Sequence, residues 1–340
     1  MIRTDLSTLF AGVDVGSKEN VLVVRVDGGA LPADRFANDL GGRKALVKRL
    51  RSFKRPVYAC LEATGSYFLG IAIALSKEKD MRVMVANPRI IKDFARAMNR
   101  RSKTDAVDAG VIALYAEKAE FVSWEPPSER LLELRNISRR IDSLTETKAA
   151  EKCRLHAHLA SGAKRSVVER DIVDHIKSIE KRIAVLRKEA LLIIKSDAAL
   201  CERYRLLLSI PGVGEITAVR LIAELALMPA CLSVRQWVAY AGLDPAAHES
   251  GTSIRRPGRT SKAGNVRLRG ALFIAALVAA RCNPVVRAFA SNLESRNKKR
   301  IQALVAVMRK LLHAIWGMFR HNSVFNAAIL FPNIAIALDS

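Results

Sequence analysis

Two carboxylates stand three residues apart in this sequence, at Asp105 and Asp108. The run that follows, 109–119, predicts a helix, and a spacing of three puts both acids on one helical face. Neighbouring carboxylates repel each other unless a cation lies between them. On a surface helix that cation is Lys or Arg, whereas in a hydrolytic or phosphoryl-transfer site it is a divalent metal completed by acids from elsewhere. Taken alone, the pair after Thr104 is more typical of a plain helix N-cap.

Two further acids each stand where an apolar, strand-like run gives way to a turn that contains glycine. They are Asp14, in Val-Asp-Val-Gly, and Glu62, in Leu-Glu-Ala-Thr-Gly. An unpaired carboxylate at the end of a buried strand is costly, so it normally faces an opening, a cation or a hydrogen-bond donor. Each acid singly could shape a turn or cap a helix. Together with Asp105 and Asp108 they make four carboxylates, enough to hold two Mg²⁺ ions, for which Mn²⁺ could substitute.

The elements that must position these acids belong to a predicted α/β domain. Apolar, β-branched runs at 9–14, 20–27 and 31–36 predict a three-strand antiparallel meander. The following pattern predicts helices at 41–53 and 66–77 and strands at 56–61 and 81–86. This order, closed by the helix at 109–119, is typical of a ribonuclease H-like domain. In that fold the first and fourth strands are neighbours, which brings Asp14 beside Glu62.

The charge of the chain indicates a polyanionic partner. It has 56 Lys and Arg against 33 Asp and Glu, a formal charge of +23. Nucleic acid is the partner that this charge favours, and a ribosome-associated or membrane-surface protein is the alternative. Aromatic residues make up only 6% of the chain, so phosphate contacts should supply more of the affinity than stacking on bases.

Cysteine usage and hydropathy predict a soluble protein of a reducing cytoplasm. The five cysteines are scattered and contain no Cys-x-x-Cys pair, which argues against a disulfide framework or a zinc site. The longest apolar run, 271–280, is too short to cross a bilayer, so no membrane partner is expected.

Past residue 125 the composition changes to Lys, Arg, Glu and Leu with apolar residues at helical spacing. Two long amphipathic helices are predicted, packed antiparallel about a break near Ser161 and Gly162. The arm could be a spacer, but we favour a homo-oligomer contact, since little else in the segment could cover its apolar stripe. The predicted domains are therefore 1–124 for catalysis, 125–199 for a coiled-coil arm and 200–340 for a mainly α-helical domain.

The last domain opens with Ile-Pro-Gly-Val-Gly-Glu, which contains Gly212 and Gly214 between two helical runs. A helix, a tight Gly-x-Gly turn and a second helix predict a helix-hairpin-helix. The amides of its turn can receive a nucleic-acid phosphate at a helix N-terminus. The alternative is a helical hairpin whose turn is purely structural.

A basic, glycine-rich loop and helix follow between 241 and 269, with small residues that let the backbone approach a phosphate. A hydroxyl in such a field is a plausible nucleophile, because nearby cations stabilise the charge that develops on phosphorus during attack. The residues alone leave three serines open: Ser250, Ser253 and Ser261. The basic residues expected to bind nucleic acid are Arg255, Arg256, Arg259, Lys262, Arg267 and Arg269.

Over almost the whole chain these linked motifs resemble the insertion-sequence DEDD transposases, relatives of a pilin-gene invertase. The motifs are Gly-Val-Asp14-Val-Gly-Ser-Lys, Leu-Glu62-Ala-Thr-Gly-Ser-Tyr, Asn87-Pro, Lys103-Thr-Asp105-Ala-Val-Asp108-Ala, Ser-Ile-Pro-Gly-Val-Gly-Glu, Tyr-Ala-Gly-Leu, Glu249-Ser250-Gly and Ser261-Lys-Ala-Gly-Asn. The resemblance implies a RuvC-like N-terminal domain and a serine-bearing C-terminal transposase domain. It also implies that the four acids form the metal-binding tetrad and that the serine of the family falls on Ser250.

The resemblance implies recombination bridged by RNA, in a prokaryotic cytoplasm and at the nucleoid when the protein acts. A structured noncoding guide RNA would pair with donor and target double-stranded DNA, and the protein would cut and rejoin strands through DNA attached covalently to the serine. The working assembly would be a dimer to tetramer in which one protomer's carboxylate site is completed by the serine domain of another. Two alternatives remain: a RuvC-like Holliday-junction resolvase or metal nuclease that uses water, and a non-catalytic nucleic-acid-binding scaffold.

Overall fold

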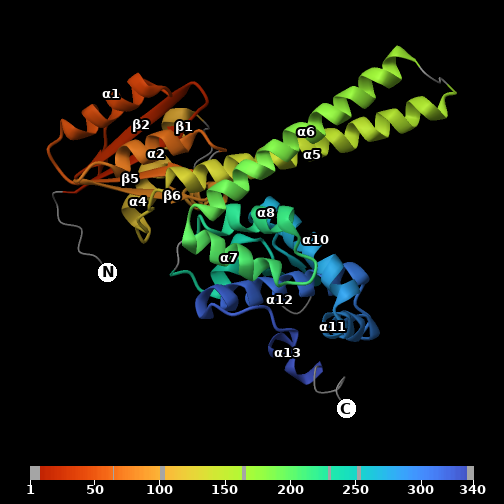
Figure 1. Ribbon diagram of the computed structural model, residues 1–340. Coiled ribbons are helices and arrows are strands. Elements are labelled where there is room, and N and C mark those ends of the chain that lie inside the picture. The colour runs from red at the N-terminus through yellow and green to blue at the C-terminus, as the bar shows by residue number, and fades with distance from the viewer. Residues whose placement is uncertain are drawn as a thin grey trace. The chain divides into compact units, whose positions relative to one another are not determined.

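The computed structural model describes residues 8–63, 65–99, 104–162, 166–228, 231–250 and 254–334, with the backbone alone for 246–250 and 254–258. The chain forms two compact units, Met1–Pro126 and Pro127–Ser340. Figure 1 colours the first from red to yellow-orange and the second from yellow through green to blue. The predicted arm and the C-terminal helices thus belong to one unit.

The first unit is built on a six-stranded mixed sheet (Figure 1). Its strands are β1 (Leu9–Val15), β2 (Glu19–Val26), β3 (Gly29–Ala30), β4 (Asp34–Ala37), β5 (Val57–Glu62) and β6 (Met81–Ala86). The order is β3-β2-β1-β5-β6, and β4 also pairs with β2. Neighbours β1 and β2 are antiparallel, whereas β5 runs parallel to both β1 and β6. The predicted adjacency of the first strand and β5 is therefore confirmed.

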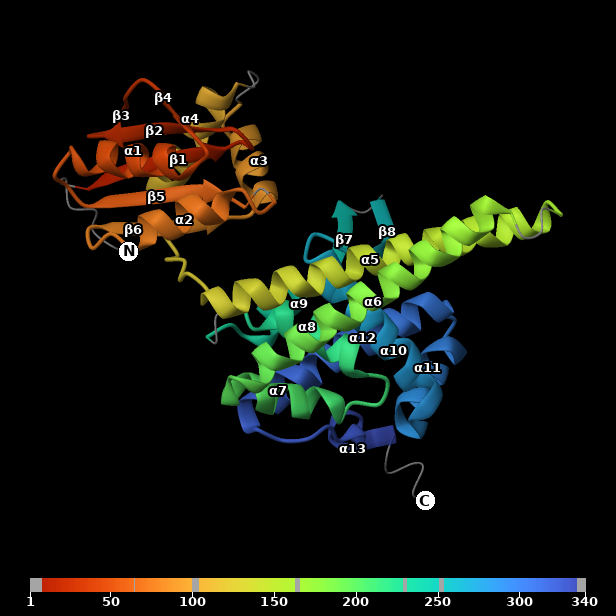
Figure 2. The same cartoon turned by 45° about the horizontal axis from the view of Figure 1, so that its top comes forward.

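Four helices cover the two faces of this sheet. They are α1 (Leu40–Arg51), α2 (Phe68–Ser76), α3 (Pro88–Ala97) and α4 (Asp105–Lys118). Alternate residues of β1 divide between two cores, because successive strand side chains point to opposite faces. Leu9 and Val13 pack with α1 and α2, while Phe10 packs with α3 and α4. Figure 2 shows α1 and α2 together on one face of the sheet.

The sequence predictions for this unit hold in outline and miss in two places. The mixed sheet with helices is consistent with the expected ribonuclease H-like fold. The predicted strand at 31–36 is shorter and begins later, as β4 at Asp34–Ala37, and the two-residue strand β3 precedes the predicted range; both pair with β2. Helix α3 was not predicted. It begins at Pro88, in the first helical position, after the side chain of Asn87 caps the backbone N–H of Arg89.

The second unit begins with two long helices, α5 (Glu129–Ala160) and α6 (Val167–Lys195), which lie side by side in Figures 1 and 2. Gly162, with φ +81°, lies just after α5, where the sequence predicts the break. Ile141 and Leu144 of α5 pack against Ile179 and Ile183 of α6. Since each helix covers the other's apolar stripe, the stripe itself does not require an oligomer partner.

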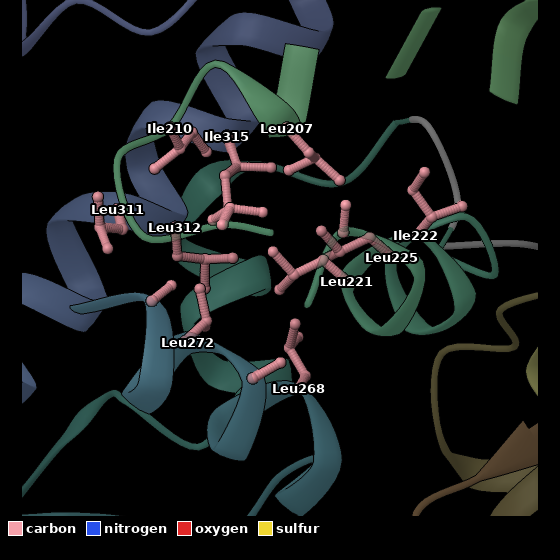
Figure 3. Packing of buried hydrophobic residues seen from close by; sticks show 14 of the residues in the cluster. Leu207, Ile210, Leu221, Ile222, Leu225, Leu268, Leu272, Leu311, Leu312 and Ile315 are labelled. Carbon is pink, nitrogen blue, oxygen red and sulfur yellow. The ribbon is translucent and has the colours of Figure 1, made fainter. Parts of the chain in front are cut away.

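The rest of the second unit is a helical body with one two-stranded hairpin. Its elements are α7 (Ala198–Leu208), α8 (Glu215–Leu225), α9 (Val234–Tyr240), β7 (Pro245–Ser250), β8 (Ile254–Thr260), α10 (Val266–Cys282), α11 (Pro284–Ser295), α12 (Arg300–His321) and α13 (Ala327–Leu330). Figure 3 shows the core where leucines and isoleucines of α7, α8, α10 and α12 meet, among them Leu207, Leu221, Leu272 and Leu312.

Among the described residues α12 is the one single helix long and apolar enough to cross a membrane. The bent pair α10 and α11 passes the same test only if it is counted as one span. The buried face of α12 includes Val307, Leu311 and Ile315, which belong to the core of the second unit. Its composition is therefore that of a core helix.

Candidate active site

Asp14 and Glu62 leave neighbouring strands on the same face of the sheet. Val13 and Leu61 are partners in the parallel β1–β5 register. Both point into the core that contains α1 and α2. Because strand side chains alternate, the next residues, Asp14 and Glu62, point to the opposite face, where α4 packs. The observed register therefore puts the two acids on neighbouring strands and on one face, as the sequence predicts.

Helix α4 reaches this face by backbone contact with β1. A Cβ on Gly12 would lie 2.1 Å from the carbonyl oxygen of Ala109 and 2.2 Å from the nitrogen of Ala113. Only a glycine admits so close an approach. The helix begins at Asp105 after the Thr104 hydroxyl accepts a hydrogen bond from the Val107 N–H at 3.3 Å. The first turn of α4, with Asp105 and Asp108, is thereby fixed against the strand that carries Asp14.

The other three acids of the predicted tetrad act electrostatically on Asp14. Burial is the largest cause that raises the pKa of Asp14, which reaches about 6. The negative charges of Asp108, Asp105 and Glu62 raise it further, and a backbone hydrogen bond from Val15 lowers it. Asp14 therefore lies within the field of all three other predicted tetrad members.

Arg35 of β4 is a basic side chain that lies near the tetrad. Arg35 pairs with Val21 in the β2–β4 register and Val21 pairs with Asp14, so Arg35 lies on the same face. Its Nη1 lies 2.5 Å from Glu19 Oε2 and 3.9 Å from Asp105 Oδ2. Within the described part of the chain, no lysine or arginine forms an ion pair with Asp14 or Asp108.

The donor set fits a hard divalent cation, although the side chains are not closed around one point. Carboxylate oxygens are the ligands that Mg²⁺ and Mn²⁺ prefer, and a cation would relieve the repulsion at Asp14. Yet nowhere in the ranges that the structure describes do three or more His, Cys, Asp or Glu side chains converge tightly enough to hold a metal. Asp14, Glu62, Asp105 and Asp108 would have to draw together to bind an ion.

The three candidate serines differ in what the structure places around them. Ser250 ends β7 and its backbone pairs with Ile254 at the end of the hairpin, while Ser253 lies outside the described residues. The Ser261 hydroxyl donates to Asp244 Oδ1 at 2.5 Å and accepts from the Ala263 N–H at 3.3 Å. Ser261 is thus engaged in a turn, where serine commonly bonds to nearby backbone.

The six predicted basic residues fall into three groups. The side chains of Arg255 and Arg256 lie outside the described part, and Arg259 and Lys262 are exposed. Arg267 Nη1 lies 3.3 Å from Asp142 Oδ2 and Arg269 donates to the Ala241 carbonyl at 2.9 Å. The last two guanidinium groups therefore have structural partners inside the second unit.

Gly212 and Gly214 lie in the turn between α7 and α8, and they face different surroundings. Gly212 has φ +92°, and a Cβ there would lie 2.7 Å from the Ala275 carbonyl of α10. Gly214 caps α8 and would have open space around a Cβ. The first glycine is required for packing against α10, and only the second lies on an open side of the turn. A nucleic-acid role for this turn remains a prediction.

A buried polar network in the second unit was missed by sequence reasoning. Glu224 of α8 is 3% exposed and receives two hydrogen bonds from Arg139 of α5, at 3.0 and 3.1 Å. The Asn265 amide donates to it at 2.7 Å and to the Tyr240 hydroxyl at 3.3 Å. The sequence signal that could have revealed this network is an acid, Glu224, inside the apolar helix α8. The network ties the long helix α5 to α8 and to the cap of α10.

Comparison with known proteins gives two family matches. Residues 11–162 match a family described as "Transposase", of the DEDD type, and residues 204–291 match "Transposase IS116/IS110/IS902 family". Together the two matches cover more than half of the chain. The first spans all four acids and the second spans the β7–β8 hairpin with Ser250.

Individual relatives agree with these families. A "Pilin gene-inverting protein" of Moraxella bovis is 29% identical over 80% of this chain and 83% of its own length. The "Insertion element IS900 uncharacterized 42 kDa protein" of Mycobacterium paratuberculosis is 25% identical over 94% of this chain and 98% of its own. The similarity thus extends over both units.

Proposed function

The chain belongs to the IS110/IS116/IS902 family of DEDD transposases, and from that premise we propose that it cuts and rejoins DNA with its carboxylate tetrad and Ser250. Members of the family are enzymes that act on DNA and use a divalent metal. The observation that supports our assignment of the tetrad is the pKa of Asp14, raised to about 6 by burial and by the charges of Asp108, Asp105 and Glu62. A carboxylate whose ionised form is disfavoured by burial and by neighbouring negative charges is typical of a functional site.

In this proposal the acids of the first unit hold the metal and orient the scissile phosphate. A divalent ion, which we take to be Mg²⁺, would supply positive charge to the phosphate oxygens as negative charge builds on them. Asp14 and Glu62 are carried by paired strands, and Asp105 and Asp108 by the first turn of α4. Carboxylates on rigid elements lose little freedom when they close around an ion.

The proposed covalent step transfers a phosphodiester to the serine. The Ser250 oxygen forms a bond to phosphorus, the bond from phosphorus to the leaving DNA oxygen breaks, and the serine proton is balanced by the proton that the leaving hydroxyl gains. Attack by another DNA hydroxyl then releases Ser250 and joins the new strand. Since one phosphodiester is exchanged for another, rejoining needs no external energy source.

Variants at the two groups test the assignment. Asp14→Asn and Ser250→Ala should each abolish excision of the element from a plasmid that carries it with its flanking DNA. The matched controls are Asp80→Asn, an exposed acid in a turn of the first unit, and Ser261→Ala, whose hydroxyl bonds to Asp244. Full excision by Ser250→Ala would remove the serine from the mechanism.

One observation favours a second candidate, a metal nuclease that hydrolyses DNA with water. All four acids lie in the unit Met1–Pro126, so the carboxylate site does not depend on the serine for its composition. Denaturing gels decide between the two. A covalent protein–DNA adduct that is present in the native chain and missing from Ser250→Ala supports transposition through serine, and its absence from both supports hydrolysis.

We further propose that a structured noncoding RNA guides the protein and that the working assembly is a dimer to tetramer. The formal charge of +23 exceeds what solubility requires and suits both RNA and DNA. Sequencing RNA that remains bound to the purified protein after DNase treatment, with native mass spectrometry of the same sample, tests both statements. A protein that carries no RNA and is monomeric when active would contradict them.

A further inference from the structure

A groove lies between α1 and α2 on the face of the sheet opposite the carboxylates. Its volume is about 480 Å³, and we call it the α1–α2 groove. Residues of α1 form one wall and residues of α2 with the turn after it form the other. Figures 1 and 2 both show the two helices on the same side of the sheet.

The groove is lined by five basic side chains and one acid. They are Arg43, Lys44, Lys48, Arg51, Lys77 and the acid Glu78. Arg51 donates to Glu78 at 2.7 Å, which neutralises that acid. In the part of the chain that the structure describes, Arg43 and the three lysines form no ion pair with a carboxylate. Four positive charges therefore line one groove without a negative partner.

The position of Arg43 is fixed by its surroundings. Its Nε and Nη2 lie 3.4 Å from the side-chain and backbone oxygens of Asn38. A Cβ on Gly70 would lie 2.3 Å from Arg43 Nη1, so the absence of a side chain at Gly70 lets the guanidinium lie against α2. A guanidinium held in place loses less freedom when it binds an anion.

The charge of the groove and its apolar lining together indicate what kind of ligand it binds. Like charges that line one groove repel one another, and a polyanion relieves that repulsion. The lining also includes the apolar residues Val47, Ile73 and Ala74, which offer surface to sugar rings while the basic side chains contact phosphates. A small hydrated anion would have no use for this apolar surface. The combination suits a nucleic-acid backbone.

The groove does not open onto the acids of the tetrad. Leu61 belongs to the core under α1 and α2, and its neighbour Glu62 points to the other face of the sheet. The sheet therefore lies between the groove and the acids. A phosphate bound in the groove is not the phosphate that is cut.

We propose that the α1–α2 groove binds the phosphate backbone of DNA away from the phosphate that is cut. The inference rests on DNA as the substrate of the proposed function. It assigns α1 and α2 to holding DNA at a distance from the reacting phosphate.

The test removes one lysine from each wall. Lys44→Gln/Lys77→Gln in the full chain should reduce the slope of log affinity against log salt for duplex DNA by about two, since each lost phosphate contact reduces it by about one. The affinity itself should fall roughly tenfold or more near physiological salt. The matched control is Lys54→Gln/Lys79→Gln, which removes two exposed lysines of the same unit that do not line the groove.

Fluorescence anisotropy with a duplex DNA and with a structured RNA hairpin separates the outcomes. Equal slopes for the groove and control variants would overturn the proposal. A slope that falls for RNA alone would overturn DNA as the occupant. Unchanged thermal unfolding of both variants confirms that their folds are intact, as expected for exposed lysines.

A cleavage readout keeps this proposal separate from the function itself. Lys44→Gln/Lys77→Gln should still cut a short oligonucleotide that occupies only the carboxylate site. Asp14→Asn should lose that cleavage and keep the native salt slope. Normal cutting by Asp14→Asn would refute the tetrad assignment and leave the groove proposal standing. A native salt slope in Lys44→Gln/Lys77→Gln would refute the groove proposal and leave the tetrad assignment standing.

Discussion

In the first unit the half-buried Asp14 faces three other carboxylates, whereas in the second unit the buried Glu224 is held by a guanidinium and an amide. Asp142 of the second unit is likewise paired, with Arg220 and Arg267. Burial of a charge costs free energy unless a partner compensates it. Glu224 and Asp142 are compensated by cations inside the second unit, whereas Asp14 forms no ion pair with a lysine or arginine in the part of the chain that the structure describes. This difference separates a structural network from a candidate site.

The largest expected effect on stability is that of Gly12→Ala. The new Cβ would lie 2.1 Å from the Ala109 carbonyl, so α4 must move away from β1. Overpacking of this kind costs about 3 kcal/mol, and displacement of Asp105 and Asp108 should abolish strand cleavage as well. The free energy of unfolding from urea titration measures the first effect.

A matched control for this change lies in α4 itself. A Cβ on Gly110 would meet nothing within 4 Å, so Gly110→Ala should stabilise the protein by about 0.5–1 kcal/mol. If Gly12→Ala and Gly110→Ala gave equal stabilities, close contact between α4 and β1 would not be what fixes the tetrad.

The next largest effect on stability should come from removing Glu224, the buried acid of the second unit. Glu224→Ala leaves Arg139 and Asn265 without their acceptor and should cost about 2–3 kcal/mol, because Arg139 is still one-third exposed. The control is Glu180→Gln, which breaks an exposed pair with Lys148 and should change stability by less than about 0.5 kcal/mol. Equal costs would show that the network is not a structural element.

Asp14→Asn should stabilise the protein, in contrast to Glu224→Ala, and the size of this stabilisation should depend on pH. The pKa of Asp14 rises from 3.8 to about 6 on folding, so the folded state binds the proton more tightly. The stability of the native protein should therefore fall as pH rises between those values. Asp14→Asn should be the more stable protein above pH 6, and this difference should vanish below the lower value.

Thermal unfolding across this range, with and without Mg²⁺, measures the effect. Mg²⁺ should raise the unfolding temperature of the native protein above pH 6 and have a smaller effect on Asp14→Asn, since ligand binding stabilises the state that binds. Asp80→Asn serves as the control. Parallel pH profiles for all three proteins would mean that the pKa of Asp14 is not raised on folding.

The smallest effect should come from Arg35→Gln. Arg35 is exposed and lies 3.9 Å from Asp105, so its loss should change stability by less than about 0.5 kcal/mol. It removes a positive charge that competes with a metal, so calorimetric titration should show Mg²⁺ bound at least as tightly as by the native chain. Weaker binding would mean that Arg35 supports the ion site in some other way.

Local periodicity made much of the fold and the tetrad predictable. The strand at 81–86 was predicted with the bounds that β6 has, and the break near Gly162 follows from composition. The shared face of Asp14 and Glu62 follows from the two-residue period of parallel strands once those strands are neighbours. These features depend on neighbours in sequence or on one strand pairing.

What could not be predicted depends on contacts between distant segments. Glu224 meets Arg139 across 85 residues and Asn265 across 41, and no local pattern encodes either partner. The same holds for Gly12, whose need to be glycine appears only once α4 packs on β1. Likewise, the sequence could not show that Ser261 is bonded to Asp244 while Ser250 stands at the end of a hairpin.

The self-covering pair α5 and α6 makes the arm adjustable in length. Gly162 follows α5, and the two helices bury apolar side chains against each other. Deleting one heptad from each helix, at facing positions, would shorten the arm by about 10.5 Å and keep the apolar stripes facing each other. A series of such matched deletions would show how long the arm has to be for the protein to act, since each variant changes the length of the arm and leaves the helical body of the second unit unchanged.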